Sequence, residues 1–161
     1  FKSSQSYYSL AGREIEREII PVLKDQNMGL LVWSPLAGGF LSGKYARGRN
    51  GNADDRHTKF AFPPVDVDKS YRIIDVLEDI AKDRESTVAR IALAWLLNQP
   101  AVTSVIIGAK RPDQLQDNLE ASGIVLTDDE LARLDEVSRL PIEYPAWPFM
   151  EEDDSIIRKH P

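Results

Sequence analysis

The sequence contains no cysteine and only two histidines among its 161 residues. Disulfides, thiolate catalysis and cysteine-based zinc sites are therefore excluded. His57 lies in a polar stretch and His160 at the terminus, where solvated side chains are far commoner than ligands. Neither histidine fits a Ser-His-Asp arrangement or a metal-ligand spacing. We therefore predict neither a hydrolytic triad nor a metal site.

The sequence also has no excess of positive charge and no long apolar run. The net charge is −6 and the isoelectric point is near 5.0, which argues against nucleic-acid binding through the overall field of the protein. No apolar run approaches the ~20 residues of a membrane-spanning helix, and no secretory signal pattern opens the chain. A hydrophobic content of 42% is enough for the core of one domain. We expect a soluble, cytoplasmic protein without a membrane partner.

The pattern of apolar residues predicts strands that alternate with helices. Residues 1–8 alternate weakly and predict a short strand, although the chain begins at Phe1 without methionine, as a fragment does. Pro100 ends one predicted helix, and Pro112 begins another at a first helical position. In chain order we expect strand 1–8, helix 13–25, strand 30–33, a long loop over 46–69, helices 70–83 and 88–98, strand 102–107, helices from 112 and from 127, and an irregular tail over 141–161.

Several of these elements have an expected buried face or a terminal signal. Pro21 interrupts the first helix and predicts a kink, and Gly29 is a plausible stop before the next strand. Thr127 and Glu130 have the T-x-x-E spacing of a capping box. The residues expected to face the core are Ile15, Ile19, Val22 and Leu23 in the first helix, Leu115 and Leu119 in the helix from 112, and Leu131 and Leu134 in the last helix.

This alternation indicates parallel strands joined by helical crossovers. Only three strands are visible, whereas a closed (β/α)₈ barrel takes ~250 residues. The fold class predicted from the pattern is therefore a partial α/β domain.

Residues 104–118 are the most informative segment and read SVIIGAKRPDQLQDN. A strand, a glycine turn and two cations precede a helix that opens on proline, an arrangement that suits a phosphate group. Lys110 and Arg111 could bind a 2′-phosphate, and Gln114 and Asn118 lie one turn apart, where both amides could reach an adenine edge. The alternative, an ordinary connection with solvated cations, is about as probable from the pattern alone.

Residues 30–45 read LLVWSPLAGGFLSGKY and repeat the strand-then-glycine design. Trp33 at the strand end could stack on a flat ring such as nicotinamide. Gly38, Gly39 and Gly43 would let backbone amides approach a pyrophosphate. A buried tryptophan followed by a flexible turn is the simpler interpretation of this segment alone. Neither segment is a G-x-G-x-x-G fingerprint, so a Rossmann domain is not supported.

Taken together, these segments resemble the C-terminal part of an aldo-keto reductase of bacterial type. The stretch with Gln5 and Tyr8-Ser9-Leu10 is similar to the sixth strand of that family's barrel. Residues 30–45 resemble the seventh strand with its cofactor loop, and residues 104–118 resemble the eighth strand with the helix that holds the adenosine 2′-phosphate. The tail over 140–147, LPIEYPAW, resembles the family's C-terminal segment.

The resemblance implies that the chain is the C-terminal half of a (β/α)₈ barrel that binds NADP(H) and reduces aldehydes or ketones. It places Gln5 at the nicotinamide carboxamide, Trp33 against the nicotinamide ring and Trp147 in the substrate loop. It leaves open whether Lys110 or Arg111 meets the 2′-phosphate. The pyrophosphate path would be lined by Ser34, Leu36, Gly38, Ser42 and Lys44, and the adenosine end would be held by Gly108, Lys110, Gln114, Asp117 and Asn118.

The same resemblance implies that the catalytic Asp, Tyr, Lys and His belong to the N-terminal half of the barrel, which this sequence does not contain. No catalytic residue is therefore assigned here, and the N-terminal half becomes an expected partner, alongside a small carbonyl substrate. Two other interpretations stay open. One is a cofactor-sensing binding module similar to potassium-channel β subunits, and the other is an inactive truncated product.

Overall fold

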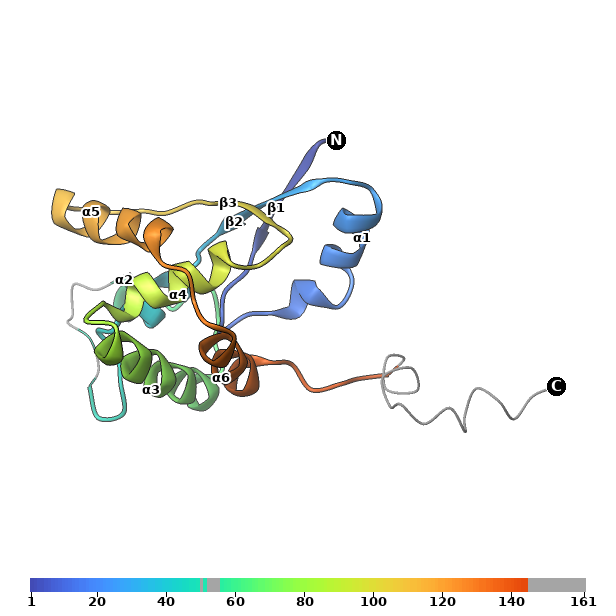
Figure 1. The fold of residues 1–161 in the computed structure, drawn as a ribbon. Helices are drawn as coiled ribbons and strands as arrows, with labels where there is room; N and C mark the ends of the chain where they lie inside the picture. The colour runs from blue at the N-terminus through green and yellow to red at the C-terminus, as the bar shows by residue number, and fades with distance from the viewer. Residues whose placement is uncertain (50, 52–55, 145–161) are drawn as a thin grey trace.

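The computed structural model describes residues 1–49, 51 and 56–144, and it has the α/β class that the pattern predicts. Its three strands form one parallel sheet in the order β1-β2-β3, from β1 (Ser3–Tyr7), β2 (Gly29–Trp33) and β3 (Val102–Val105). Tyr7 pairs with Trp33, and Val32 pairs with Val105, so the carboxyl ends of all three strands lie along one edge (Figure 1).

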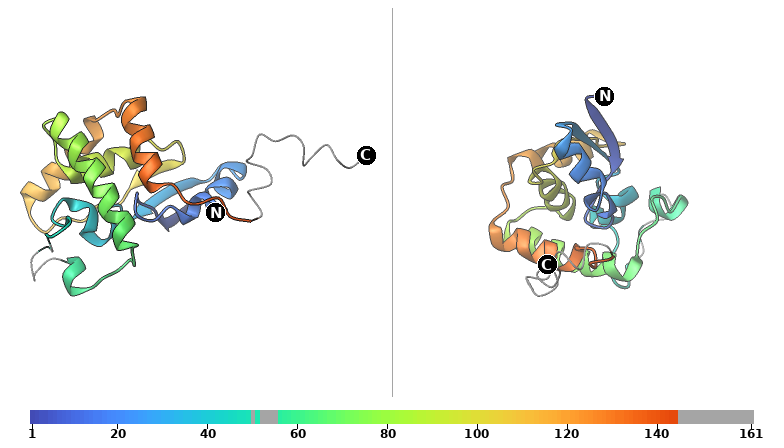
Figure 2. Two further views of the ribbon diagram at one scale, coloured as in Figure 1. Left: turned by 90° about the horizontal axis from the view of Figure 1, so that it is seen from below. Right: turned by 90° about the vertical axis from the view of Figure 1, so that its right-hand side faces the viewer.

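Beside the sheet, the described chain contains six α-helices and three 3₁₀ helices. The helix α4 contacts β3, α3 packs on α4, and α6 packs on α3 (Figure 2). The helices are α1 (Ile19–Asp25), α2 (Arg56–Lys59), α3 (Val67–Asp83), α4 (Val88–Leu97), α5 (Pro112–Glu120) and α6 (Asp128–Ser138), with the 3₁₀ helices η1 (Glu14–Glu16), η2 (Ala37–Ser42) and η3 (Ala121–Gly123).

The core lies between the sheet and α3, α4 and α6. In β2, alternate residues are buried, because successive side chains of a strand point to opposite faces. Leu30 and Val32 are fully buried in the same cluster as Trp95 of α4 and Leu134 of α6. Leu31 and Trp33, on the opposite face of β2, are only half-buried.

The predicted helix over 13–25 is wrong in its extent and in its buried face. The structure has η1 and then α1, which begins at Ile19. Pro21 is the third residue of α1, where its missing N–H costs no hydrogen bond. Because α1 begins at Ile19 and does not continue from residue 13, the buried face differs from the predicted one. Ile20 and Leu23 are buried, while Ile19 and Val22 are exposed. The helix ends at Asp25 through a left-handed residue at position 27, not at position 29.

The predicted inward face of the helix from 112 is also wrong, because Leu115 and Leu119 are 44% and 52% exposed.

The predicted loop over 46–69 is interrupted by α2 and ends early, because the Asp66 side chain caps α3 by accepting from the Lys69 amide at 2.9 Å. The third predicted strand is shorter than expected and ends at Val105.

The predicted capping box of α6 is confirmed. The Thr127 hydroxyl accepts from the Glu130 amide, and the Glu130 carboxylate accepts from the Thr127 amide at 2.7 Å. The same carboxylate binds Arg84 in a fork, which joins α6 to the end of α3. The Arg84 bond is the main reason that the pKa of Glu130 is lowered to about 2, with further help from Thr127.

We predict that the Arg84–Glu130 pair makes stability depend on acid pH. The unfolded state, with an ordinary Glu130 pKa near 4.5, takes up the proton first, so the stabilisation is present above that pH and is lost as pH falls toward 2. After allowance for solvent screening we expect about 1 kcal/mol. Urea unfolding at pH 2–5 should show a shallower pH slope in Glu130→Gln and in Arg84→Gln. An unchanged slope in both variants would contradict the assignment.

Candidate functional site

Of the two predicted nicotinamide residues, Trp33 lies at the carboxyl edge of the sheet and Gln5 in the middle of β1. Trp33 is the last residue of β2, and its ring lies 5.3 Å from that of Tyr7, the last residue of β1. Gln5 lies on β1 with an exposed side chain and pairs with Leu31. The structure thus places Gln5 and Trp33 on neighbouring strands, with Gln5 two residues before the end of β1.

A second aromatic residue, which the sequence reasoning missed, contacts Trp33. The Phe62 ring stacks on the Trp33 ring with centroids 5.9 Å apart and planes 12° apart. The signal was the pair of phenylalanines in the KFAFPP stretch of the predicted loop. Exposed aromatic residues placed in a loop are uncommon enough to suggest a contact surface.

The turn after β2 is held by its own hydrogen bonds. The Ser34 hydroxyl accepts from the Gly38 amide at 2.9 Å, and the Ser42 hydroxyl donates to the Gly39 carbonyl at 2.6 Å. Gly38 and Gly39 have φ of 67° and 97°, a region that favours glycine. The hydroxyls and the Gly38 amide predicted to line the pyrophosphate path are therefore engaged within the turn. Of the other predicted lining residues, Leu36 is half-buried and Lys44 exposed.

The two predicted phosphate-binding cations differ in their surroundings. Arg111 is exposed, and its guanidinium forms a fork with the Asp113 carboxylate at 2.8 and 3.0 Å, which lowers the pKa of Asp113. Lys110 is exposed too, and among the described residues none forms an ion pair with its ammonium. Its amide donates to the Gln114 side chain at 3.1 Å. The structure therefore favours Lys110 as the cation available to an incoming anion.

Two further predicted adenosine residues lie on α5. The Asp117 carboxylate accepts from the Thr87 hydroxyl at 3.0 Å and lies 2.8 Å from Nε of Arg90. Both oxygens are thus directed at the start of α4, and Asp117 joins α5 to that helix. Asn118 is half-buried beside it. Gly108 lies in the turn before α5. No other atom lies within 4 Å of the place where a side chain on Gly108 would begin, so there is open space beside this turn.

Trp147 lies outside the described residues. Within the part of the chain that the structure describes, no cluster of His, Asp or Glu could hold a metal ion. No helix there is both long and apolar enough to span a bilayer.

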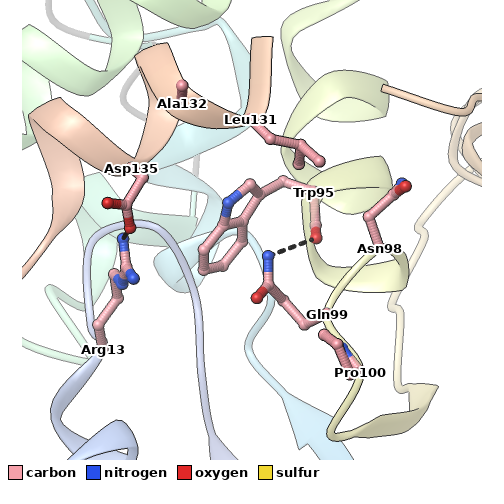
Figure 3. A pocket seen from close by; sticks show the side chains of 8 residues that line it. All are labelled: Arg13, Trp95, Asn98, Gln99, Pro100, Leu131, Ala132 and Asp135. Carbon is pink, nitrogen blue, oxygen red and sulfur yellow. Dashed lines mark hydrogen bonds and ion pairs between the residues drawn. The ribbon is translucent and has the colours of Figure 1, made fainter. Parts of the chain in front are cut away.

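A cavity of about 440 Å³ lies away from this edge, between the end of α4 and α6 (Figure 3). Asn98, Gln99 and Pro100 line it just before β3 begins, so it lies toward the amino end of that strand. Leu131 and Ala132 line its other side. None of the predicted cofactor residues contributes to it.

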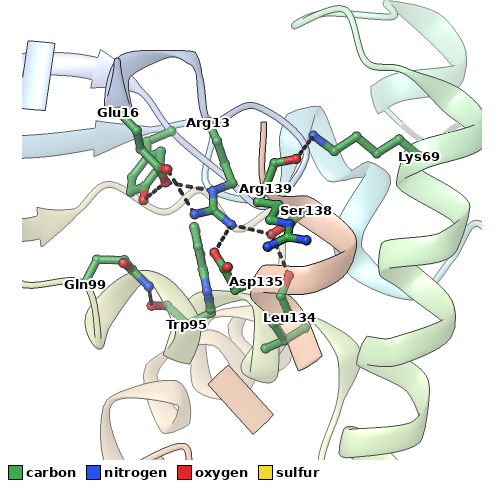
Figure 4. Close-up of polar contacts among 10 residues, drawn as sticks. Arg13, Glu16, Lys69, Trp95, Gln99, Leu134, Asp135, Ser138 and Arg139 are labelled. Atoms are coloured by element: carbon green, nitrogen blue, oxygen red, sulfur yellow. Dashed lines mark hydrogen bonds and ion pairs between the residues drawn. The ribbon is translucent and has the colours of Figure 1, made fainter. Parts of the chain in front are cut away.

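The cavity borders a cluster of charges around the buried Arg13 side chain (Figure 4). The guanidinium forms a fork with Glu16 at 2.8 and 2.9 Å, contacts Asp135 at 2.7 Å and lies over the Trp95 ring at 5.3 Å. Burial opposes the charge, but the two carboxylates outweigh it and raise the pKa of Arg13. Burial, with Glu16 beside it, also raises the pKa of Tyr8, whose phenol donates to that carboxylate. This cluster joins the loop after β1 to α4 and α6, which is a structural role.

Comparison with known proteins agrees with the predicted family. Residues 1–139 match the model of the aldo/keto reductase family, and the chain therefore belongs to this family.

Three relatives illustrate its range. An uncharacterized oxidoreductase, YrpG of Bacillus subtilis, is 35% identical over 136 residues, 84% of this chain and 40% of that protein. A probable voltage-gated potassium channel subunit beta of Arabidopsis thaliana is 34% identical over 140 residues, 81% of this chain and 42% of that protein. L-glyceraldehyde 3-phosphate reductase of Escherichia coli K12 is 31% identical over 142 residues, 82% and 40% respectively. The chain spans about two fifths of the length of these relatives.

We predict that Arg13→Met lowers the free energy of unfolding by about 2 kcal/mol, because Glu16 and Asp135 lose the cation between them. Urea denaturation measures the change. Arg133→Met is the matched control, because Arg133 pairs with Asp79 only at 3.6 Å on the surface and should contribute less than about 0.5 kcal/mol. Equal effects of the two substitutions would show that the cluster has no special weight.

Proposed function

We propose that the chain forms the cofactor-binding part of an NADP(H)-dependent oxidoreductase that interconverts aldehydes or ketones with alcohols. One observation carries the proposal. The strand end with Trp33 and the turn that leads to Lys110 lie along the carboxyl edge of one parallel sheet. Ligands of α/β proteins bind at this edge, and active sites of (β/α)₈ barrels are built there.

The sheet itself supports a larger barrel. In the described residues, the outer edges of β1 and β3 have no strand partner. Exposed edges of this kind are normally closed or covered, and barrel closure removes them. We infer that an N-terminal half supplies the remaining strands and the catalytic acid, consistent with relatives that are more than twice as long as this chain.

Each proposed cofactor contact uses chemistry that its residue can provide. The Gln5 amide can both donate to and accept from a carboxamide, and an indole such as that of Trp33 can stack on a flat ring. Lys110 provides a positive charge for a 2′-phosphate, and open space beside Gly108 admits the adenosine end. The bound cofactor would supply the hydride. The chain would hold the cofactor in place, while the proton would come from outside these 161 residues.

A second candidate function is a cofactor-sensing subunit, which the relative from Arabidopsis thaliana favours. Both candidates need the same cofactor edge. They differ in turnover, because a reductase must turn over steadily whereas a sensing subunit need only bind the cofactor. Steady reduction of simple aldehydes by the natural polypeptide that contains this sequence would exclude the sensor.

The first prediction from this proposal concerns the phosphate cation. Lys110→Ala should raise the Kd for NADPH about tenfold or more and leave that for NADH nearly unchanged, since a charge-assisted bond to phosphate contributes about 1.5–3 kcal/mol. Arg111→Ala should have a smaller effect, because Asp113 already neutralises Arg111. Asp113→Asn should strengthen NADPH binding by freeing Arg111. Isothermal titration of both cofactors measures these changes, and equal losses for NADPH and NADH would refute the assignment.

The second prediction concerns the stacking face. Trp33→Phe should retain cofactor binding, whereas Trp33→Leu should weaken NADPH and NADH alike by about three- to tenfold, because stacking contributes about 0.5–1.5 kcal/mol. The same titrations measure both variants. If Trp33→Leu bound both cofactors as tightly as the unchanged protein, the nicotinamide would not lie on this ring.

A further inference from the structure

The cavity between α4 and α6 contains none of the proposed cofactor residues, yet polar and apolar side chains converge on it. We call it the α4–α6 cavity. Figure 3 shows the Trp95 indole at the centre of its lining side chains. Leu131 and Ala132 of α6, together with Pro100, give the cavity apolar walls. Its volume of about 440 Å³ lies within the range of small-molecule sites, which is about 300–1,000 Å³.

Two side-chain amides that line the α4–α6 cavity leave their oxygens as hydrogen-bond acceptors. The Asn98 amide donates to the Ala94 carbonyl at 2.8 Å, and the Gln99 amide donates to the Trp95 carbonyl at 3.2 Å. Each amide thus turns its nitrogen toward the backbone of α4. Within the described chain, no group donates to the side-chain oxygen of either residue. Both oxygens can therefore accept from a molecule in the cavity.

The charge balance beside the cavity is negative. Arg13 lines the cavity, but its guanidinium is buried. Its N–H groups are used by the Glu16 carboxylate and the Ser138 hydroxyl, and it also contacts the Asp135 carboxylate. The Glu16 carboxylate is occupied in turn by Arg13 and by the Tyr8 phenol. Two carboxylates therefore contact one guanidinium, which leaves a single negative charge uncompensated within this cluster.

Asp135 places that negative charge at the cavity wall. Arg13 contacts Asp135 at Oδ1, 2.7 Å away, whereas no group of the described chain donates to Oδ2. The Asp135 side chain is 49% exposed and lines the cavity, so a ligand can reach it. Lys69, whose ammonium lies 3.4 Å from the Arg139 carbonyl, does not line the cavity. The accessible charge is therefore an anionic acceptor.

We propose that the α4–α6 cavity binds a small organic monocation, which is an ammonium or guanidinium group on a short hydrocarbon chain. The charged head donates to Asp135 and to the amide oxygens of Asn98 and Gln99, since all three are acceptors. The hydrocarbon chain lies against the two apolar residues of α6. An anion would be repelled by Asp135 and would find the N–H groups of Arg13 already used. The site is separate from the cofactor edge and does not rest on the proposed function.

The test follows the Trp95 indole N–H by NMR in the natural polypeptide that contains this sequence, labelled with ¹⁵N-tryptophan. Loss of one resonance in Trp95→Phe assigns it. Butylguanidinium should shift this resonance saturably, and methylguanidinium should bind more weakly because it lacks the chain. 1-Butanol and butyrate keep a hydrocarbon chain without the cation, so each should bind at least about tenfold more weakly than butylguanidinium.

Three variants locate the binding groups. Asp135→Asn should weaken butylguanidinium binding about tenfold, because a neutral amide replaces the charged acceptor. Gln99→Leu leaves the contacts of Arg13 intact and should weaken binding about threefold through the lost acceptor. Asp79→Asn makes the same charge change at a 72% exposed position of α3, and this matched control should bind as the unchanged protein does.

The site is overturned if butylguanidinium gives no saturable shift, or if 1-butanol or butyrate binds as tightly. Unchanged binding in Asp135→Asn or in Gln99→Leu also overturns it, as does an equal loss in Asp79→Asn. These measurements use no cofactor and no turnover, so a failure of this site is distinguishable from a failure of the proposed function.

Discussion

Burial of one face of β2 is the constraint on which the candidate site depends. Leu30 and Val32 are fully buried in the core, and the alternation of a strand therefore turns Leu31 and Trp33 to the other face. A slip of one residue would bury Trp33 and expose Val32, so the hydrophobic core fixes the register. The parallel pairing of β2 with its neighbours then sets which residues surround Trp33 at the strand ends.

Local sequence signals correctly predicted helices whose first turn is capped by a side-chain hydrogen bond. The capping box at Thr127 and Glu130 and the helix over 88–98 are examples. Periodicity failed where a polar contact decides which face of a helix is turned inward. In α5 the spacing of the apolar residues predicts that Leu115 faces the core. The helix instead contacts α4 through the Asp117 carboxylate, and Leu115 is exposed. A hydrophobic pattern cannot predict a contact made by charge.

The candidate site shows the same division. Motif spacing predicted that Trp33 and Lys110 belong to one site, because the ends of parallel strands meet at one edge. It did not show that Arg111 is paired, since a fork with Asp113 two residues later depends on the turn that precedes α5. Motif spacing also missed the contact of Phe62 with Trp33, because the sequence of a loop does not predict which strand the loop packs against. The structure supplies these pairings and shows that the two adjacent cations differ in their partners.

The helix α4 links the stable part of the fold to the proposed cofactor edge. Near its carboxyl end, Trp95 lies under the buried guanidinium of Arg13. At its amino end, Thr87 and Arg90 hold Asp117 and thereby fix α5. Lys110 lies two residues before Pro112, the first residue of α5, so its position depends on contacts that hold this helix. If the proposed phosphate site lies at Lys110, Thr87 and Arg90 would act as positioning residues for it, through the packing of α4 in the core.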